Sequence, residues 1–284
     1  MLARLTFLKC CLFFTLLVST FSSIHAEEKA ITPKDCAIKL FNGKNLDGLY
    51  VWMRDTAFED PRKVFTVNDK GYLHISGDGY GGLITKKSYR DYHMVIEFKW
   101  GEKTWANRVD RTRDSGVLFH CHGPEGGYGN TWHASIEAQI IEGGVGDILV
   151  LTGKDQKTGE PIPTSLTCEF TKDRDGEKIW KRGSPRTTLS SGRVNWLHRD
   201  VDWVDKINFR GKQDVESEFG KWTRMDVICD GGHVLIKVNG VEVNEGFEAN
   251  PSEGKLLVQT ELAEMFVRKW ELWPLGKAPE YKKE

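Results

Sequence analysis

The sequence predicts an all-β protein in which two antiparallel sheets form a sandwich with long loop insertions. Apolar and polar residues alternate in short runs, which is the pattern of strands that bury one face. Turns rich in Gly, Asn and Asp separate these runs, as they do in sandwich folds. No long amphipathic helix is indicated, and 284 residues are enough for a single domain of this kind.

Individual strands can be placed in chain order. In residues 93–100, the alternate apolar side chains from Met94 to Trp100 share one face, while Glu97 and Lys99 share the other. The same alternation recurs along the chain and defines the remaining strands. They are expected at 83–85, 117–122, 135–140, 225–229, 256–260 and 265–272.

Two hairpins and two long loops complete the pattern. Asn239-Gly240 favours a type I′ turn, so the apolar runs on either side of it should pair as a hairpin. Residues 101–115 are charged and poor in strand signals. Residues 152–193 are rich in Pro and Gly, and they contain a second expected hairpin that turns at 173–176. Loops of this length are often binding loops, and a solvated decoration is the alternative.

The first 26 residues have the order of a secretory signal peptide. Arg4 and Lys9 precede an apolar run at 10–18, and small residues then lead to a cleavage site after Ala26. The apolar run is too short to span a bilayer. We therefore expect a periplasmic or secreted protein, with one domain at 27–284 and no membrane anchor after cleavage.

The charge balance and the cysteines limit the class of protein. Forty Lys and Arg residues oppose 41 Asp and Glu, for a net charge of -1. A nucleic-acid-binding protein needs a basic surface, so no nucleic-acid partner is expected. Beyond the leader, Cys36, Cys121, Cys168 and Cys229 would form two disulfides or remain small buried thiols. The sequence favours neither, and it does not indicate an oligomeric state.

Histidines and carboxylates gather in residues 114–147. His120 and His122 fall on one expected strand, and Glu137 and Gln139 share a face of the next. Glycines flank both strands, which favours a cleft over a solvated face. Glu137 and His120 are therefore candidates for a catalytic base, and the two histidines for metal ligands. A plain outer-face carboxylate and a buried, hydrogen-bonded histidine are the competing interpretations.

Glu137 and Glu142 also resemble the paired glutamates of laminarinase-type glucanases, whose Glu-x-Asp-x-x-Glu motif lies on one strand. In those enzymes a β-bulge brings both side chains to one face, and a retaining mechanism needs carboxylates about 5–5.5 Å apart. Here Gln139 stands in place of the aspartate. This change argues against a conventional retaining glycosidase, and Glu142 could serve as an acid only if a bulge is present.

Seven short blocks carry a family resemblance that covers nearly the whole chain beyond the leader, roughly 37–273. In their order they resemble the 3-keto-disaccharide hydrolase domain family, also described as 3-keto-glucoside 1,2-lyase/3-keto-2-hydroxy-glucal hydratase. The resemblance implies a concanavalin A-like jelly roll and an exported enzyme acting on oligosaccharides or 3-keto-glycosides. The blocks are 41–46, 81–89, 97–100, 114–117, 135–147, 209–216 and 257–268.

The chemistry implied by this resemblance is an elimination. A ketone at C3 acidifies the proton at C2, a base removes that proton, and the C1 substituent leaves as an alcohol. Glu137, His120 or His122 would be the base. A cation at the enolate oxygen would stabilise the intermediate, supplied by Lys99, Arg268 or a divalent metal such as Mn²⁺, Zn²⁺ or Ca²⁺. No spacing in the sequence is diagnostic of a metal site, and no other cofactor is expected.

The remaining candidates are polar and aromatic side chains that would line the pocket, with Trp132 offering a ring for sugar stacking. The expected substrate-binding residues are Glu97, Lys99, His122, Gln139, Trp132, Gln259, Glu261 and Arg268. Two other functions remain open. One is a glycan-binding module without turnover, since many sandwiches only bind. The other is a conventional glycosidase that uses Glu137 and Glu142.

Overall fold

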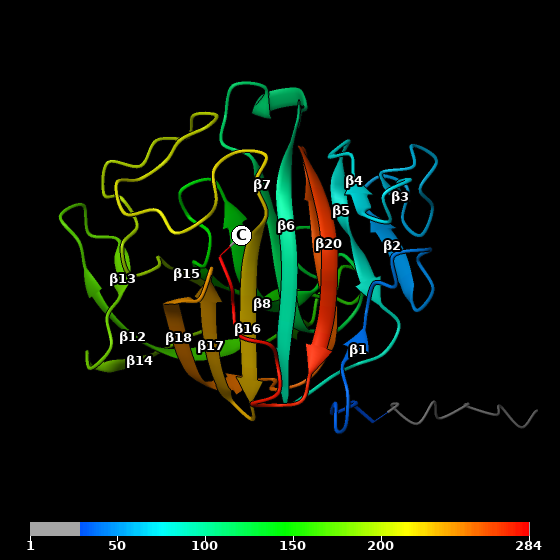
Figure 1. Ribbon diagram of the computed structural model, residues 1–284. Helices are drawn as coiled ribbons and strands as arrows, with labels where there is room; N and C mark the ends of the chain where they lie inside the picture. Colours follow the sequence, from blue (N-terminus) through cyan, green and yellow to red (C-terminus); the bar gives the residue numbers. More distant parts are fainter. Residues whose placement is uncertain (1–28, 284) are drawn as a thin grey trace, which may run out of the picture.

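The computed structural model describes residues 29–283, and its regular structure consists almost entirely of antiparallel strands. Two large sheets of seven and eleven strands pack against one another around a shared hydrophobic core (Figure 1). The expected two-sheet sandwich is therefore confirmed. The expected signal peptide lies outside the described residues. Within 29–283, no helix is long and apolar enough to cross a membrane.

The seven-stranded sheet holds the segment in which histidines and carboxylates gather. Its central strands pair in antiparallel ladders, so that neighbouring outward side chains stand side by side where the register is unbroken. The spatial order is β15 (Gly192–Val194), β9 (Ile148–Leu151), β8 (Ala134–Ile141), β7 (Asp114–His122), β19 (Lys255–Glu261), β5 (Tyr80–Thr85) and β2 (Leu49–Met53).

The eleven-stranded sheet forms the other layer. Its order is β13 (Lys178–Trp180), β12 (Ser165–Lys172), β18 (Val241–Asn250), β17 (His233–Val238), β16 (Thr223–Asp230), β6 (Tyr92–Thr104), β20 (Ala263–Trp273), β4 (Leu73–Ile75) and β3 (Phe65–Val67), with β1 (Ile38–Lys39) beside β20 and β14 (Arg186–Leu189) beside β12. The remaining elements are a two-stranded ribbon of β10 (Gly153–Lys154) and β11 (Pro161–Ile162), and the 3₁₀ turn η1 (Ala106–Arg108).

Period-two alternation determines which side chains enter the core. Ile96 and Phe98 of β6 point inward and meet Val117 and Phe119 of β7 in the same buried cluster. Fully burying a side chain of this size stabilises the fold by about 1.5–3 kcal/mol. The same alternation turns Glu97 to the outer face of its sheet. Each sheet therefore turns one apolar face toward the shared core.

Both expected hairpins are present. Val238 pairs with Val241 across the Asn-Gly turn, and Phe170 pairs with Trp180 across the second turn. The second hairpin is not a loose decoration, because β12 also pairs with β18 and extends the large sheet. The charged loop is shorter than expected, since β6 continues to Thr104.

The sequence pattern missed three strands of the seven-stranded sheet, β2, β9 and β15. Residues 148–151 read Ile-Leu-Val-Leu, a short apolar run without alternation, because both faces of β9 are covered. All four described cysteines are free, and three of them are buried as small apolar groups.

Candidate functional site

The outer face of the seven-stranded sheet carries a polar cluster at its centre. The apolar neighbours of Glu137 and Gln139 on β8 face the core, so these two side chains face outward. The adjacent strands add Asp114 from β7 and Gln259 and Glu261 from β19. Four of these five residues are at most 5% exposed. A chain that buries this many carboxyl and amide groups needs compensating partners for them.

Gly116 provides the space for this cluster. It lies on β7 directly opposite Gln139 in the ladder. A Cβ atom at this position would overlap the Glu137 carboxylate and would lie 2.7 Å from Gln259 Oε1. Only glycine leaves room for the two side chains to approach each other above the strand.

Arg108 and Gln139 hold one end of the cluster. The Arg108 guanidinium donates to Asp114 Oδ2, and its Nη2 lies 3.7 Å from Glu261 Oε1. Gln139 Nε2 donates to the other oxygen of Asp114 at 2.9 Å. Both carboxylate oxygens of Asp114 are therefore hydrogen-bonded, and the carboxylate holds the Arg108 side chain in place.

Burial and mutual repulsion perturb all three carboxyl groups. Burial, followed by the nearby Asp114 charge, raises the pKa of Glu137 to about 8. Burial raises the pKa of Asp114 to about 6, although Arg108 and Arg193 act in the opposite direction. Burial and the two other carboxylates also raise the pKa of Glu261 well above its ordinary value. Perturbed groups of this kind concentrate at catalytic sites.

Arg193 places a second positive charge at the cluster. It projects from the edge strand β15, and its Nε lies 3.8 Å from Asp147 Oδ2. Its charge lowers the pKa values of Glu137, Asp114 and Glu261, so its guanidinium acts on all three carboxyl groups. The side chain is 34% exposed. A partly exposed cation above buried carboxyl groups can contact a ligand that enters from solvent.

Two buried amide oxygens in the cluster have no hydrogen-bond partner in the described structure. They are Gln139 Oε1 and Gln259 Oε1. An unpartnered buried carbonyl costs roughly 1–3 kcal/mol, so such groups need an explanation. Both are acceptors, and the hydroxyl groups of a bound sugar would satisfy them.

The loop at 123–133 covers the neighbouring part of this face. Trp132 Nε1 donates to the Gly81 carbonyl at 2.9 Å, and Glu125 accepts from the Tyr50 hydroxyl at 2.9 Å. These contacts fix the loop that carries Tyr128. Burial and the charges of the Glu137 and Glu261 carboxyl groups raise the pKa of Tyr128. Its hydroxyl therefore stays protonated beside the cluster at neutral pH.

The structure brings together five of the residues expected from the sequence: Glu137, Gln139, Gln259, Glu261 and the nearby Trp132. Three others lie on the outer face of the opposite sheet. There Glu97 accepts from Arg268 Nε at 2.6 Å, and Lys99 Nζ lies 5.1 Å from the centre of the Trp222 ring. The core separates these three from Glu137, so they cannot contact a ligand bound there.

The histidines are also placed away from the cluster. A bulge in β7 between Phe119 and His122 interrupts the alternation. His120 is fully buried, its ring lies 5.2 Å from that of Phe119, and burial lowers its pKa to about 3. The ring nitrogens of His122 lie 3.0 Å and 3.1 Å from the carbonyl oxygens of His120 and Pro163. The expected pair of ligands does not converge.

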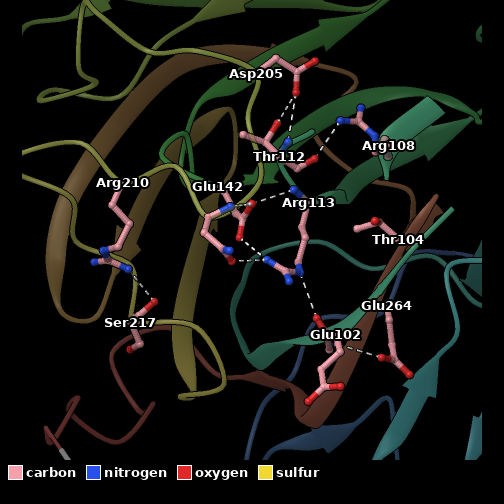
Figure 2. A network of polar contacts seen from close by, with 12 residues as sticks. Glu102, Thr104, Arg108, Thr112, Arg113, Glu142, Asp205, Arg210, Ser217 and Glu264 are labelled. Carbon is pink, nitrogen blue, oxygen red and sulfur yellow. Dashed lines mark hydrogen bonds and ion pairs between the residues drawn. The ribbon is translucent and has the colours of Figure 1, made fainter. Parts of the chain in front are cut away.

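Glu142 belongs to a separate buried network, shown in Figure 2. Strands β7 and β8 pair in regular register from Asp114 to Phe119, so the bulge required for an acid role is absent. Glu142 Oε1 accepts from Arg113 Nη1 at 2.6 Å, and Oε2 accepts from the Arg113 and Asn208 backbone amides. The carboxylate is therefore held in a structural ion pair.

The carboxyl groups of the cluster lie beside two arginines. The positive charge near them comes from Arg108 and Arg193. Among residues 29–283, no group of three or more His, Cys, Asp or Glu side chains is arranged to bind a metal ion.

The sequence profile of a family described as "3-keto-alpha-glucoside-1,2-lyase-like domain" matches residues 36–272. The chain belongs to this family. The match confirms the resemblance seen in the seven sequence blocks, and it supports the expectation of a carbohydrate-active protein. A search of curated proteins gave no match.

Solved structures with a related fold share little sequence with the chain. A candidate glycosyl hydrolase from Parabacteroides distasonis is 16% identical, with 84% of this chain and 94% of that chain covered and a TM-score of 0.48. The carbohydrate-binding module CBM66 from Bacillus subtilis is 9% identical, with coverage of 78% and 93% and a TM-score of 0.42. A galectin-like protein of unknown function from the same species is 9% identical, with coverage of 86% and 97% and a TM-score of 0.45. These likenesses concern the fold alone.

Sequence reasoning missed three residues of the site, Arg108, Asp114 and Arg193, and it indicated Tyr128 only as an aromatic residue for sugar stacking. Arg108 lies in the charged loop and Arg193 at the end of the Pro- and Gly-rich stretch, both of which interrupt the strand pattern. The interruption of the strand pattern was the only feature of the sequence that pointed to these two segments. It marked the two loops as candidate binding loops, but it did not select one arginine from several.

Proposed function

We propose that this domain cleaves 3-keto-glycosides by removing the C2 proton and eliminating the C1 substituent. The observation that carries the proposal is Glu137, a buried carboxyl group with a pKa of about 8. It shares its face with a cation, Arg193, and with two unpartnered amide oxygens. Family membership supports the class of substrate.

Glu137 is the base in this mechanism. Its carboxylate takes the C2 proton, and the electron pair of the C–H bond moves toward the C3 ketone to form an enolate. A base with a pKa near the working pH combines adequate ionisation with strong proton affinity. The Arg193 guanidinium lies where it can stabilise the developing negative charge on the enolate oxygen. Glu137 then carries the proton.

Tyr128 completes the elimination as the acid. The enolate electron pair forms the C1–C2 double bond, the C3 ketone is restored, and the bond from C1 to the leaving oxygen breaks. The Tyr128 hydroxyl donates its proton to that oxygen, so the aglycone departs as a neutral alcohol. The unpartnered oxygens of Gln139 and Gln259 accept hydrogen bonds from the sugar hydroxyls and hold the ring in place.

The test is a paired turnover assay with the purified protein. A nitrophenyl glucoside and its 3-keto derivative are supplied separately, each with and without EDTA. We expect release from the 3-keto substrate alone. Glu137→Gln should lower that rate by about 10²–10⁴-fold, the usual contribution of a general base.

The other outcomes separate the competing functions. Release from the unoxidised glucoside would indicate a conventional glycosidase, and no release from either would favour a glycan-binding module. Loss of activity with EDTA would show that a metal takes part. Unchanged turnover in Glu137→Gln would contradict the assigned base. The predicted leader would deliver this activity to the periplasm or the medium, and detection of the cleaved protein outside the cytoplasm tests that expectation.

A further inference from the structure

A second concave site lies on the other side of the molecule. A cavity of about 1170 Å³ opens on the outer face of the eleven-stranded sheet. Glu97 forms part of its floor, with Arg224 and Lys269 beside it in the ladder. One wall is the loop at 210–221, and the other is the C-terminal segment at 279–283, which runs in front of β16 in Figure 1. Sites for single small ligands have volumes of roughly 300–1,000 Å³, so this cavity suits a larger ligand.

The floor of the cavity carries excess positive charge. Its carboxylate, Glu97, accepts from Arg268 Nε at 2.6 Å and from Lys269 Nζ at 2.9 Å. One negative charge therefore faces two cations. The walls add Arg210 and Lys221. The Arg210 guanidinium donates to the Ser217 carbonyl (Figure 2) and to the Glu216 carbonyl, each at 2.8 Å. A neutral backbone acceptor does not cancel the arginine charge.

Five carboxyl groups and seven basic side chains line the cavity, so basic side chains are in excess. The carboxyl groups are Glu97, Asp214, Glu216, Glu218 and Glu280. Glu216 is only 6% exposed, and its buried Oε2 has no hydrogen-bond partner among the described residues. Asp214 beside it also has an unpartnered Oδ2. Burial raises the pKa values of both groups.

Aromatic rings extend the site beyond the cavity. Trp222 lies at the rim, with Tyr72 edge-on at a centroid distance of 5.0 Å. On the side of Tyr72 lies a smaller hollow of about 330 Å³, which Lys99 and Phe266 also line. Lys99 Nζ is 5.1 Å from the centre of the Trp222 ring and thus connects the two hollows. Cations and aromatic rings therefore lie in contact on this surface.

We propose that this face is a second carbohydrate-binding site, and that it takes an acidic oligosaccharide. Carboxylate or sulfate groups of the oligosaccharide would pair with Arg210, Lys221 and Lys269, and a sugar ring would pack beside Trp222. The site is distinct from the Glu137 face, because the core lies between them. It goes beyond the proposed function, since binding here requires no turnover at Glu137.

The experiment measures binding by calorimetry to the full protein. The probes are an oligogalacturonate, a sulfated chondroitin oligosaccharide and a neutral cello-oligosaccharide of equal length. We expect the carboxylated or the sulfated probe, or both, to bind at least tenfold more tightly than the neutral one. The affinity should fall as salt is raised, because exposed charges are screened. The difference between the two acidic probes identifies the preferred anion.

A charge-reversed variant locates the site. Lys221→Glu combined with Lys282→Glu places negative charge on both walls, and we expect it to weaken acidic binding at least tenfold. The matched control is Lys44→Glu combined with Lys157→Glu, which changes the net charge equally at exposed lysines away from the cavity. The control should bind like the unmodified protein. Turnover of the nitrophenyl 3-keto-glucoside should be unchanged in both variants.

Three results would overturn the proposal: equal affinity for neutral and acidic probes, no binding of any probe, or equal loss in both double variants. Equal loss would indicate non-specific attraction by net charge. Binding of nucleic acid in preference to the acidic sugars would likewise refute it. Acidic binding that persists when the 3-keto assay fails would leave this proposal standing and reject only the proposed elimination.

Discussion

Ionisation of Glu137 affects both the proposed chemistry of the site and the stability of the fold. Its folded pKa of about 8 exceeds the ordinary glutamate value of 4.5. Between these two values the folded protein holds a proton that the unfolded chain releases. The contribution of Glu137 to the free energy of unfolding therefore falls as the pH rises through this range, by about 1.4 kcal/mol for each unit of pH. Catalysis needs the ionised form, so activity and stability should change in opposite directions.

We therefore predict two results for this residue. The kcat/KM of the unmodified protein for a 3-keto-glucoside should rise with pH up to about pH 8, where Glu137 becomes ionised. Glu137→Gln should be more stable than the unmodified protein at pH 8, by a few kcal/mol, and nearly equal to it at pH 4.5. Denaturant unfolding at both pH values measures the second result.

Glu142 supplies the matched control for this prediction. Glu142→Gln removes one member of a buried ion pair with Arg113 and should destabilise the fold at both pH values, by about 3–5 kcal/mol. If Glu137→Gln behaved in the same way, Glu137 would be a structural carboxylate and not a base held at a cost to stability.

The contrast between these glutamates also shows that the sequence predicts which way a side chain faces but not which distant residue it contacts. Period-two alternation identified the outward face of Glu137 and Gln139, because it depends only on neighbours along one strand. It could not show that Glu142 meets Arg113, or that Arg193 lies beside Asp147. Those contacts join residues that are far apart in the chain, and only the packed fold brings them together.

At the scale of elements, the loop at 123–133 determines whether the site has an acid. It holds Tyr128 beside the carboxyl groups through contacts of Trp132 and Glu125. A nitrophenolate leaves readily without a proton, whereas a sugar or alkyl alkoxide needs one. Tyr128→Phe should thus slow release of an alkyl alcohol from its 3-keto-glucoside by about 10²-fold or more. Release of nitrophenol should change only a few-fold.

The ratio of the two rates distinguishes loss of the acid from a general disturbance of the loop. A variant that merely disturbed the loop would slow both substrates to a similar extent. Trp132→Phe is the comparison, because it removes the hydrogen bond to Gly81 without removing the Tyr128 hydroxyl. An equal loss on both substrates in Tyr128→Phe would exclude Tyr128 as the acid.

Element boundaries illustrate a second limit of the sequence pattern. The strands 93–100 and 135–140 were predicted because they alternate over several residues, and β6 and β8 confirm them. The bulge at His120 was not predictable from alternation, since the extra residue depends on how β7 pairs with β8 and β19. His120 and His122 were therefore expected on one face, and the bulge separates them.

At the scale of the whole molecule, the sandwich core separates the two proposed binding sites, which lie on the outer faces of different sheets. The residues that the sequence predicts to line one pocket lie on two different outer faces, because strands β6 and β20 belong to a different sheet from β7, β8 and β19. The core itself contains the polar ring of His120, and His133 is nearly as buried. Neither of the His120 ring nitrogens has a hydrogen-bonded partner among the described side chains.

These buried histidines should make the fold sensitive to acid. Burial lowers the pKa of His120 to about 3 and that of His133 to about 4, below the ordinary value of 6.5. Below pH 6.5, these histidines bind protons in the unfolded chain but not in the folded protein. The contribution of each histidine to the free energy of unfolding therefore falls as the pH falls, by about 1.4 kcal/mol per pH unit.

The slope of stability against pH tests this expectation even if a variant is destabilised overall. His120→Asn retains a side chain that tolerates the positive φ of 53° at this position. Between pH 6 and pH 4, its unfolding free energy should fall less steeply than that of the unmodified protein, by about 1 kcal/mol per unit. His133→Asn should reduce the slope in the same direction, with the effect ending near pH 4. Parallel curves for all three proteins would mean that these histidines do not remain neutral in the core, and that acid acts on the fold through other groups.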